Sequence, residues 1–107
     1  MKGLLLGLAA TLALPTAAQA ATFMNGDFET GSNPGSYFLR LGTDSTALTG
    51  WTITSGNVEL KGGYWEAGSG DRSIDLNGSM MGAIAQTFDT VAGMAYNVDF
   101  LMAGNPE

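Results

Sequence analysis

The side chains best suited to bind a ligand lie near the middle of the chain. Tyr64 and Trp65 are adjacent, and Asp71 and Arg72 follow after a loop rich in glycine and serine. Aromatic rings at a loop edge offer a flat apolar face, on which the C–H face of a sugar stacks. Carboxylate, guanidinium and amide groups hydrogen-bond to its hydroxyls. With Asn57 from the preceding turn, these residues predict a carbohydrate site, the alternative being that Trp65 closes one end of the fold.

Catalytic groups are scarce in this sequence. It contains no His and no Cys, which excludes Ser-His-Asp triads, thiol nucleophiles and zinc sites built from imidazole or thiolate. Paired carboxylates such as Glu66 and Asp71 could in principle hydrolyse a glycosidic bond. They lie on a Gly/Ser loop with no apolar neighbours to hold one of them protonated, so we expect a protein that is not an enzyme.

Overall charge narrows the range of partners. The chain has 4 basic and 10 acidic residues and a net charge of −6. Binding to phosphate groups needs clustered Lys and Arg, so neither nucleic acid nor an anionic membrane surface is an expected partner.

The N-terminus has the features of a secretory signal peptide. Lys2 precedes the apolar run Leu4 to Leu14, and Ala18-Gln19-Ala20 forms a small-x-small cleavage motif. The run is too short to cross a bilayer as a helix, which takes ~20 residues. We expect residues 1–20 to be removed by cleavage between Ala20 and Ala21, with no membrane insertion of the mature chain, and we expect a secreted or cell-surface protein of bacterial origin.

The rest of the chain, residues 21–107, has the alternating pattern of β-strands. Apolar and polar residues alternate in short runs separated by Gly, Asn, Ser and Pro, and no run has a helical period. Short strands at this spacing indicate an antiparallel sandwich or barrel. The expected strands are 21–29, with a possible irregularity at Asn25-Gly26, and 37–41, 47–54, 58–61, 72–76, 83–88 and 95–102, the last being the clearest.

Alternation also predicts where some side chains point. Trp51 shares a face with Ile53 and is expected in the core. Asp75 is expected on the outward face, either hydrogen-bonded to nearby loops or in solvent. Gln86 is expected to point inward, where its amide must find partners, and we predict that it hydrogen-bonds to loop backbone.

Four segments, taken in order, carry a family resemblance. They are Asn25 to Glu29; Gly50 to Ile53 with Ser55 to Leu60; Trp65 with Gly70 to Gly78; and Gln86 to Phe88 with Gly93, Tyr96 to Val98, Phe100 and Ala103 to Pro106. In these segments the sequence resembles the choice-of-anchor C family and the plant cell-wall proteins of the DUF642 type, which are galactose-binding-like domains.

The resemblance implies a fold and a setting. The fold is a galactose-binding-like jelly-roll β-sandwich, whose domain in this family runs on for several more strands, so we expect the sandwich to be incomplete at its C-terminal side. The implied function is non-catalytic binding of a cell-wall or surface polysaccharide or glycoprotein. The alternative is a structural matrix or adhesion module that contacts proteins without binding sugar.

A structural calcium ion is a further implication of the resemblance. Sugar-binding domains of similar fold often use a carboxylate of the first Phe-Glu element, which here is Glu29, with Asp27 beside it. Calcium prefers several oxygen ligands at once, but the partner Asp of the last strand has no counterpart in this sequence. The alternative for Glu29 is a solvated acid at the end of a strand.

Overall fold

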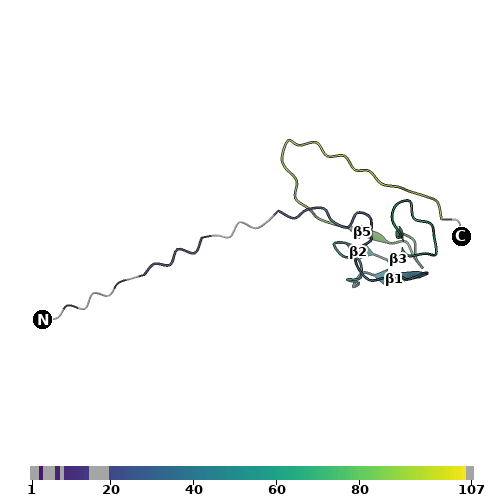
Figure 1. Ribbon diagram of the computed structural model, residues 1–107, viewed down its shortest axis with the longest axis horizontal. Coiled ribbons are helices and arrows are strands. Elements are labelled where there is room, and N and C mark those ends of the chain that lie inside the picture. Colours follow the sequence, from purple (N-terminus) through teal and green to yellow (C-terminus); the bar gives the residue numbers. More distant parts are fainter. Residues whose placement is uncertain (1–2, 4–6, 8, 15–19, 106–107) are drawn as a thin grey trace.

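The computed structural model describes residues 3, 7, 9–14 and 20–105, and within them the protein is all-β. Five short strands form two antiparallel sheets, and the described part contains no helix. No segment of that part could therefore cross a bilayer as a helix. Figure 1 shows the sheets gathered together, with residues 9–14 extending away from them. Much of the predicted signal peptide lies outside the described residues.

The larger sheet has three strands in the order β1-β3-β4. β1 (Phe38–Gly42) and β4 (Ser73–Asp75) both pair antiparallel with the central strand β3 (Asn57–Lys61). β3 and β4 alternate apolar and polar residues, and the register pairs Leu39 and Ile74 with Leu60 on one face, and Arg40 and Asp75 with Glu59 on the other.

The smaller sheet pairs β2 (Thr52–Ser55) with β5 (Ala83–Ala85). Gly56 connects β2 directly to β3 and has a φ of 56°. A Cβ atom at this position would collide with the backbone carbonyl of Met81. The turn between the two sheets therefore requires glycine, both for its conformation and for the close approach of a neighbouring chain segment.

The hydrophobic core lies where the two sheets face each other. Its fully buried members come from both sheets and from the segment before β2, and each is at most 4% exposed. Trp51 packs against this cluster and its indole N–H donates to the Asn25 carbonyl at 2.8 Å, which confirms the prediction that Trp51 is a core residue. The buried members are Leu41, Leu48, Ile53, Val58 and Leu60.

Charged residues occupy the opposite face of the larger sheet. Glu59 lies directly across from Arg40 on β1 and from Asp75 on β4, and Lys61 is on the same face of β3 because side chains alternate along a strand. Asp75 thus points away from the core, as predicted, and its carboxylate accepts a hydrogen bond from the Asn77 backbone N–H at 2.9 Å.

The expected first strand, residues 21–29, is wrong. Asn25 and Phe28 have positive φ values of 53° and 63°, which an extended strand does not allow. The Asn25 side chain hydrogen-bonds to the backbone of Thr30 and Thr49 instead. This side-chain bonding replaces the ladder of a strand with a compact turn.

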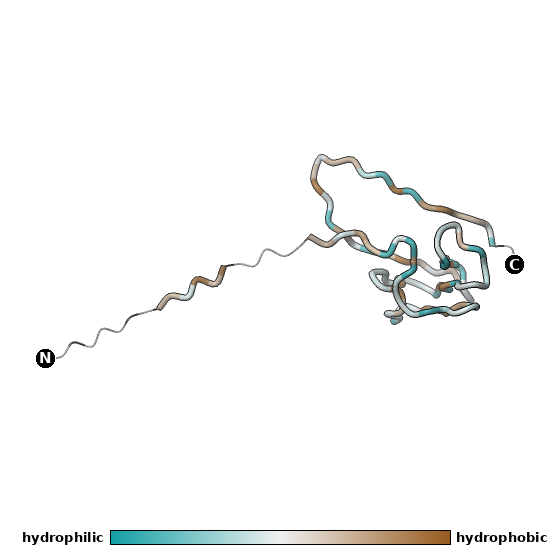
Figure 2. Tube along the Cα trace, in the orientation of Figure 1, coloured by the Kyte–Doolittle hydropathy of each residue, from teal (hydrophilic) through white to brown (hydrophobic). Residues whose placement is uncertain are grey.

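The expected strand at residues 95–102 is also absent. These residues pair with no described strand, and Phe100 is 76% exposed. Figures 1 and 2 show the segment after β5 as an arc away from the sheets, with hydrophobic residues along it. The expected strand 83–88 likewise ends at Ala85. Alternation was present in both places, but a strand also needs a neighbour to pair with.

Candidate functional site

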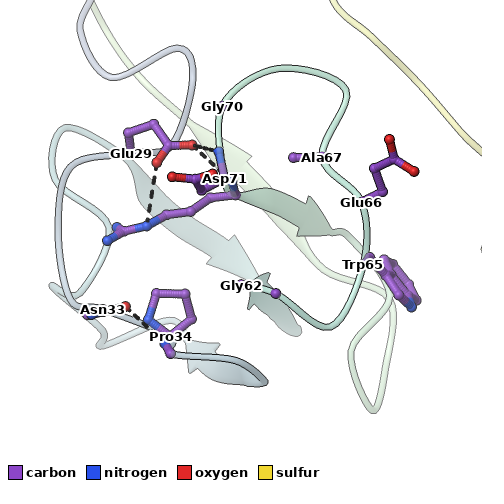
Figure 3. A pocket seen from close by; sticks show the side chains of 12 residues that line it. Glu29, Asn33, Pro34, Gly62, Trp65, Glu66, Ala67, Gly70 and Asp71 are labelled. Carbon is purple, nitrogen blue, oxygen red and sulfur yellow. Dashed lines mark hydrogen bonds and ion pairs between the residues drawn. The ribbon is translucent and has the colours of Figure 1, made fainter.

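A polar pocket of about 640 Å³ opens beside the end of the larger sheet. It is lined by Glu29 and by residues 33–35, 62–63, 65–67 and 70–72. Most of these belong to the loop that joins β3 to β4. Figure 3 shows Trp65 and Glu66 on the far side of the pocket from Glu29, with Gly62 between them. The pocket therefore contains Trp65, Asp71 and Arg72 of the predicted carbohydrate site, together with Glu29 of the predicted calcium site.

Glu29 anchors one end of this loop. Its Oε1 accepts hydrogen bonds from the backbone N–H groups of Asp71 at 2.7 Å and Arg72 at 2.9 Å, and its Oε2 lies 3.8 Å from Arg72 Nε (Figure 3). Gly70 has a φ of 66°, and a Cβ there would collide with the Glu29 carboxylate. Glycine at position 70 is thus needed for this anchor to form.

Two carboxylates in the pocket remain available. Asp71 and Glu66 are exposed, and no hydrogen bond or ion pair joins their side chains to any other described residue. Arg72, in contrast, is engaged with Glu29 and donates to the Ser32 carbonyl at 3.4 Å. The groups that the pocket leaves free to a ligand are therefore mainly hydrogen-bond acceptors.

Aromatic rings continue from the wall of the pocket. Trp65 and Tyr64 are stacked, with ring centroids 6.2 Å apart and an interplanar angle of 28°. Tyr37 meets Tyr64 edge-on at 4.9 Å and lies 4.5 Å from Phe38. Tyr64 does not line the pocket itself but extends its aromatic wall along the end of the sheet.

Lys61 lies beneath these rings. Its side-chain nitrogen is 4.2 Å from the centroid of Trp65, 4.4 Å from that of Phe38 and 5.2 Å from that of Tyr64. Although charged, Lys61 is only 2% exposed. Distances of this size are those of cation–π contacts, which are strongest when the cation is desolvated.

Glu59 is the principal counter-ion of Lys61. The two are joined at 2.6 Å, and a second carboxylate, that of Asp75, lies 3.9 Å from the lysine nitrogen. Glu59 also accepts two hydrogen bonds from Arg40, at 2.6 and 3.1 Å. Burial by itself would raise the pKa of Glu59, but the hydrogen bonds and charges of Lys61 and Arg40 outweigh it and hold the pKa below its usual 4.5.

Besides Tyr64, two predicted site residues lie outside the pocket. Asn57, at the start of β3, exchanges hydrogen bonds of 2.8 Å with Ser79 and thereby holds the turn after β4. Asp27 accepts from the backbone N–H of Glu29 at 3.3 Å. Within the described residues, no group of three or more His, Cys, Asp or Glu is placed to hold a metal ion.

The network around Lys61 was missed by sequence reasoning. A signal for it was present, because Glu59 and Lys61 are two residues apart on a strand and so share a face. Tyr64 and Trp65 follow only three and four residues after Lys61. The alternation was used only to predict a strand at residues 58–61, and neither Glu59 nor Lys61 was given a role.

The fold and the pocket together define a small all-β module with two antiparallel sheets. The chain belongs to the family described as "Protein of unknown function (DUF642)", whose profile matches residues 21–107. It is also similar to halomucin of Haloquadratum walsbyi, with 39% identity over 94 residues that cover 84% of this chain and 1% of that protein. The chain thus spans a very small part of this relative, and no solved structure matches it significantly.

Proposed function

We propose that this protein is a secreted or surface-associated, non-catalytic module that binds a cell-wall or surface polysaccharide or glycoprotein. The observation that carries the proposal is the pocket itself, in which Trp65 lies across from Asp71 and Glu29. An aromatic ring at the rim of a pocket that also carries hydrogen-bonding groups has the chemistry that a sugar ring needs. Similarity to a protein named as a mucin supports the extracellular setting.

Uncharged glycans are the ligands that the pocket favours. Asp71 and Glu66 offer unpaired carboxylates, whereas Arg72 is already bonded to Glu29 and Ser32. Lys61 is buried and Arg40 is bonded to Glu59. Since each described cation is engaged, an acidic sugar would meet carboxylates without a free positive charge to balance it.

Binding rather than hydrolysis is proposed because of how the acids are placed. Glycoside hydrolysis requires one carboxyl group kept protonated, usually by apolar surroundings, opposite a second that is ionised. The unpaired acids of the pocket, Asp71 and Glu66, are both exposed on a loop. Such groups can accept hydrogen bonds from hydroxyls without acting as an acid–base pair.

The test is a glycan array followed by calorimetric titration of the best neutral and acidic ligands. Asp71→Ala removes an exposed carboxylate from the pocket while leaving its backbone hydrogen bond to Glu29. Loss of a hydrogen bond to a charged group, worth about 1.5–3 kcal/mol, should weaken binding roughly tenfold or more. Asp44→Ala, beyond the other end of β1, is the matched control and should bind normally. Absence of binding to any glycan, or equal affinity in Asp71→Ala, would contradict the proposal.

A second candidate function is a structural or adhesion module that contacts proteins. It is favoured by the exposed apolar side chains of the segment after β5, among them Val98, Phe100 and Met102. Exposed apolar surface of this kind marks sites of protein association. A chain that binds no glycan but self-associates or captures other surface proteins, with loss of this on Phe100→Ser, would support this alternative instead.

A further inference from the structure

The strongest unexplained feature is a lysine that is almost fully buried on the outer face of a sheet. We propose that Lys61 is the positioning residue of the carbohydrate site, holding Trp65 and Tyr64 in place through its ammonium group. This inference rests on the proposed function for its biological meaning, but its structural part can be tested without a ligand.

The burial of Lys61 calls for a reason beyond stability. Removing an ammonium from water is energetically costly, and a buried ion pair is often no more stabilising than apolar residues of the same size. Here the charge is balanced by Glu59 at 2.6 Å and by Asp75 at 3.9 Å. The two carboxylates fix the ammonium at one point above the sheet, next to the rings.

Three rings converge on that point from two parts of the chain. Phe38 belongs to β1, whereas Tyr64 and Trp65 belong to the loop between β3 and β4, and all three lie within 4.2–5.2 Å of the ammonium. The loop is rich in glycine and would lose much conformational entropy on ordering. The Lys61 ammonium contacts both the sheet and the loop and so holds the loop in place without backbone hydrogen bonds between strands.

The loop is thereby held at both ends. Glu29 anchors its later part through the backbone of Asp71 and Arg72, and Lys61 anchors its earlier part through Trp65. The pocket lies between these two anchors. A wall fixed before the ligand arrives saves the entropy of ordering it on binding, so Lys61 is expected to affect affinity although it does not line the pocket.

The experiment uses the chain labelled with 5-fluorotryptophan, which gives one ¹⁹F signal each for Trp51 and Trp65. The double variant Glu59→Gln, Lys61→Met removes both members of the closest ion pair and leaves Asp75, whose side chain is 10% exposed, as the remaining carboxylate. We expect the Trp65 signal to broaden or shift toward that of the free amino acid while the Trp51 signal stays, and glycan affinity to fall tenfold or more. Arg40→Met is the control: it also removes a cation bonded to Glu59, but one that does not contact Trp65.

An unchanged Trp65 signal in a folded double variant would overturn the proposal. If the double variant unfolds and loses both signals, the positioning role is tested on the wild-type chain. Its Lys61 ε-methylene protons should resonate upfield of free lysine because of the ring currents of Trp65 and Phe38, and a value equal to that of free lysine would overturn the positioning role. A Trp65 signal that responds as expected in a chain that binds no glycan would refute the proposed function alone.

Discussion

The ion pair between Glu59 and Lys61 allows a quantitative test of how this sheet is stabilised. The perturbation is Lys61→Met, which removes the charge and shortens the unbranched side chain by one atom. It leaves Glu59, which is 5% exposed, with a single cationic partner, Arg40, whose own side chain is 49% exposed. Breaking a buried pair from one side typically costs about 3–5 kcal/mol. That is a large part of the ~5–15 kcal/mol by which small proteins are stable.

Neutralising both partners should restore most of this loss. When a buried pair is replaced as a whole by residues of similar size, the change is often neutral or better. The double variant Glu59→Gln, Lys61→Met is therefore expected within about 2 kcal/mol of wild type. Arg40→Met, which removes a half-exposed partner of the same carboxylate, should cost no more than about 1 kcal/mol.

The assay is urea unfolding at pH 7, monitored by tryptophan fluorescence. A loss of stability appears as a lower midpoint at an unchanged slope. The expected order of midpoints places wild type and Arg40→Met highest, then the double variant, and Lys61→Met lowest. If Lys61→Met unfolds at the same urea concentration as Arg40→Met, or if the double variant is no better than the single one, the reasoning is refuted.

Four further predictions follow from the same contacts. Glu59 faces Lys61, Arg40 and Asp75, and its lowered pKa contributes stability that is fully present above about pH 4.5 and is lost as the pH falls through the folded-state pKa. Thermal melts from pH 7 to 3 should therefore show a steeper loss of melting temperature in wild type than in Glu59→Gln, and parallel curves would contradict this. Trp51→Ala should cost about 3–5 kcal/mol and abolish soluble expression, so a cooperative melt of the variant near the wild-type temperature would argue against its core role. Gly70→Ala should cost about 1–3 kcal/mol of stability from its positive φ and the displaced Glu29 carboxylate. The cost should exceed that of Gly35→Ala, where φ is 64° but a Cβ meets no atom within 4 Å. Equal urea midpoints for the two variants would disprove the role of Glu29 in anchoring the loop. Since one oxygen of Glu29 already accepts hydrogen bonds from two backbone N–H groups, millimolar calcium is expected to leave the melting temperature unchanged. A clear rise in melting temperature would support a calcium site at Glu29.

Several features of the fold could be predicted because they depend on neighbours along the chain. Alternation located β1, β3 and β4 to within one residue at each end, since period two is a local property of a half-buried strand. The expected strand 47–54 began five residues too early, because β2 begins at Thr52. Gln86 was expected to point inward and to bond to loop backbone. Its side chain is half-buried, and its amide exchanges hydrogen bonds of 2.7 and 2.9 Å with the backbone of Met24. An amide that loses water must find partners, which made the bonding to backbone predictable without knowing the partner.

The candidate site was predictable only in part. Trp65, Asp71 and Arg72 could be grouped because they lie close in sequence, and the structure places them around one pocket. Asn57 lies outside the pocket because it begins β3, whose other end leads into the loop. Glu29 joins the pocket from far away in the sequence, through hydrogen bonds to Asp71 and Arg72.

The sequence by itself determined which residues can alternate, turn or stack, because these properties belong to each residue and its immediate neighbours. Only the tertiary structure decided which alternating segments pair: residues 95–102 have the pattern of a strand but no described partner, and residues 21–29 turn because Asn25 finds Thr30 and Thr49. It also decided that the charged face of β3 is covered. Strand pairing and burial depend on segments distant in sequence. Lys61 has Glu59, Tyr64 and Trp65 nearby in sequence, but only the fold brings Asp75 of β4 and Phe38 of β1 to its ammonium group.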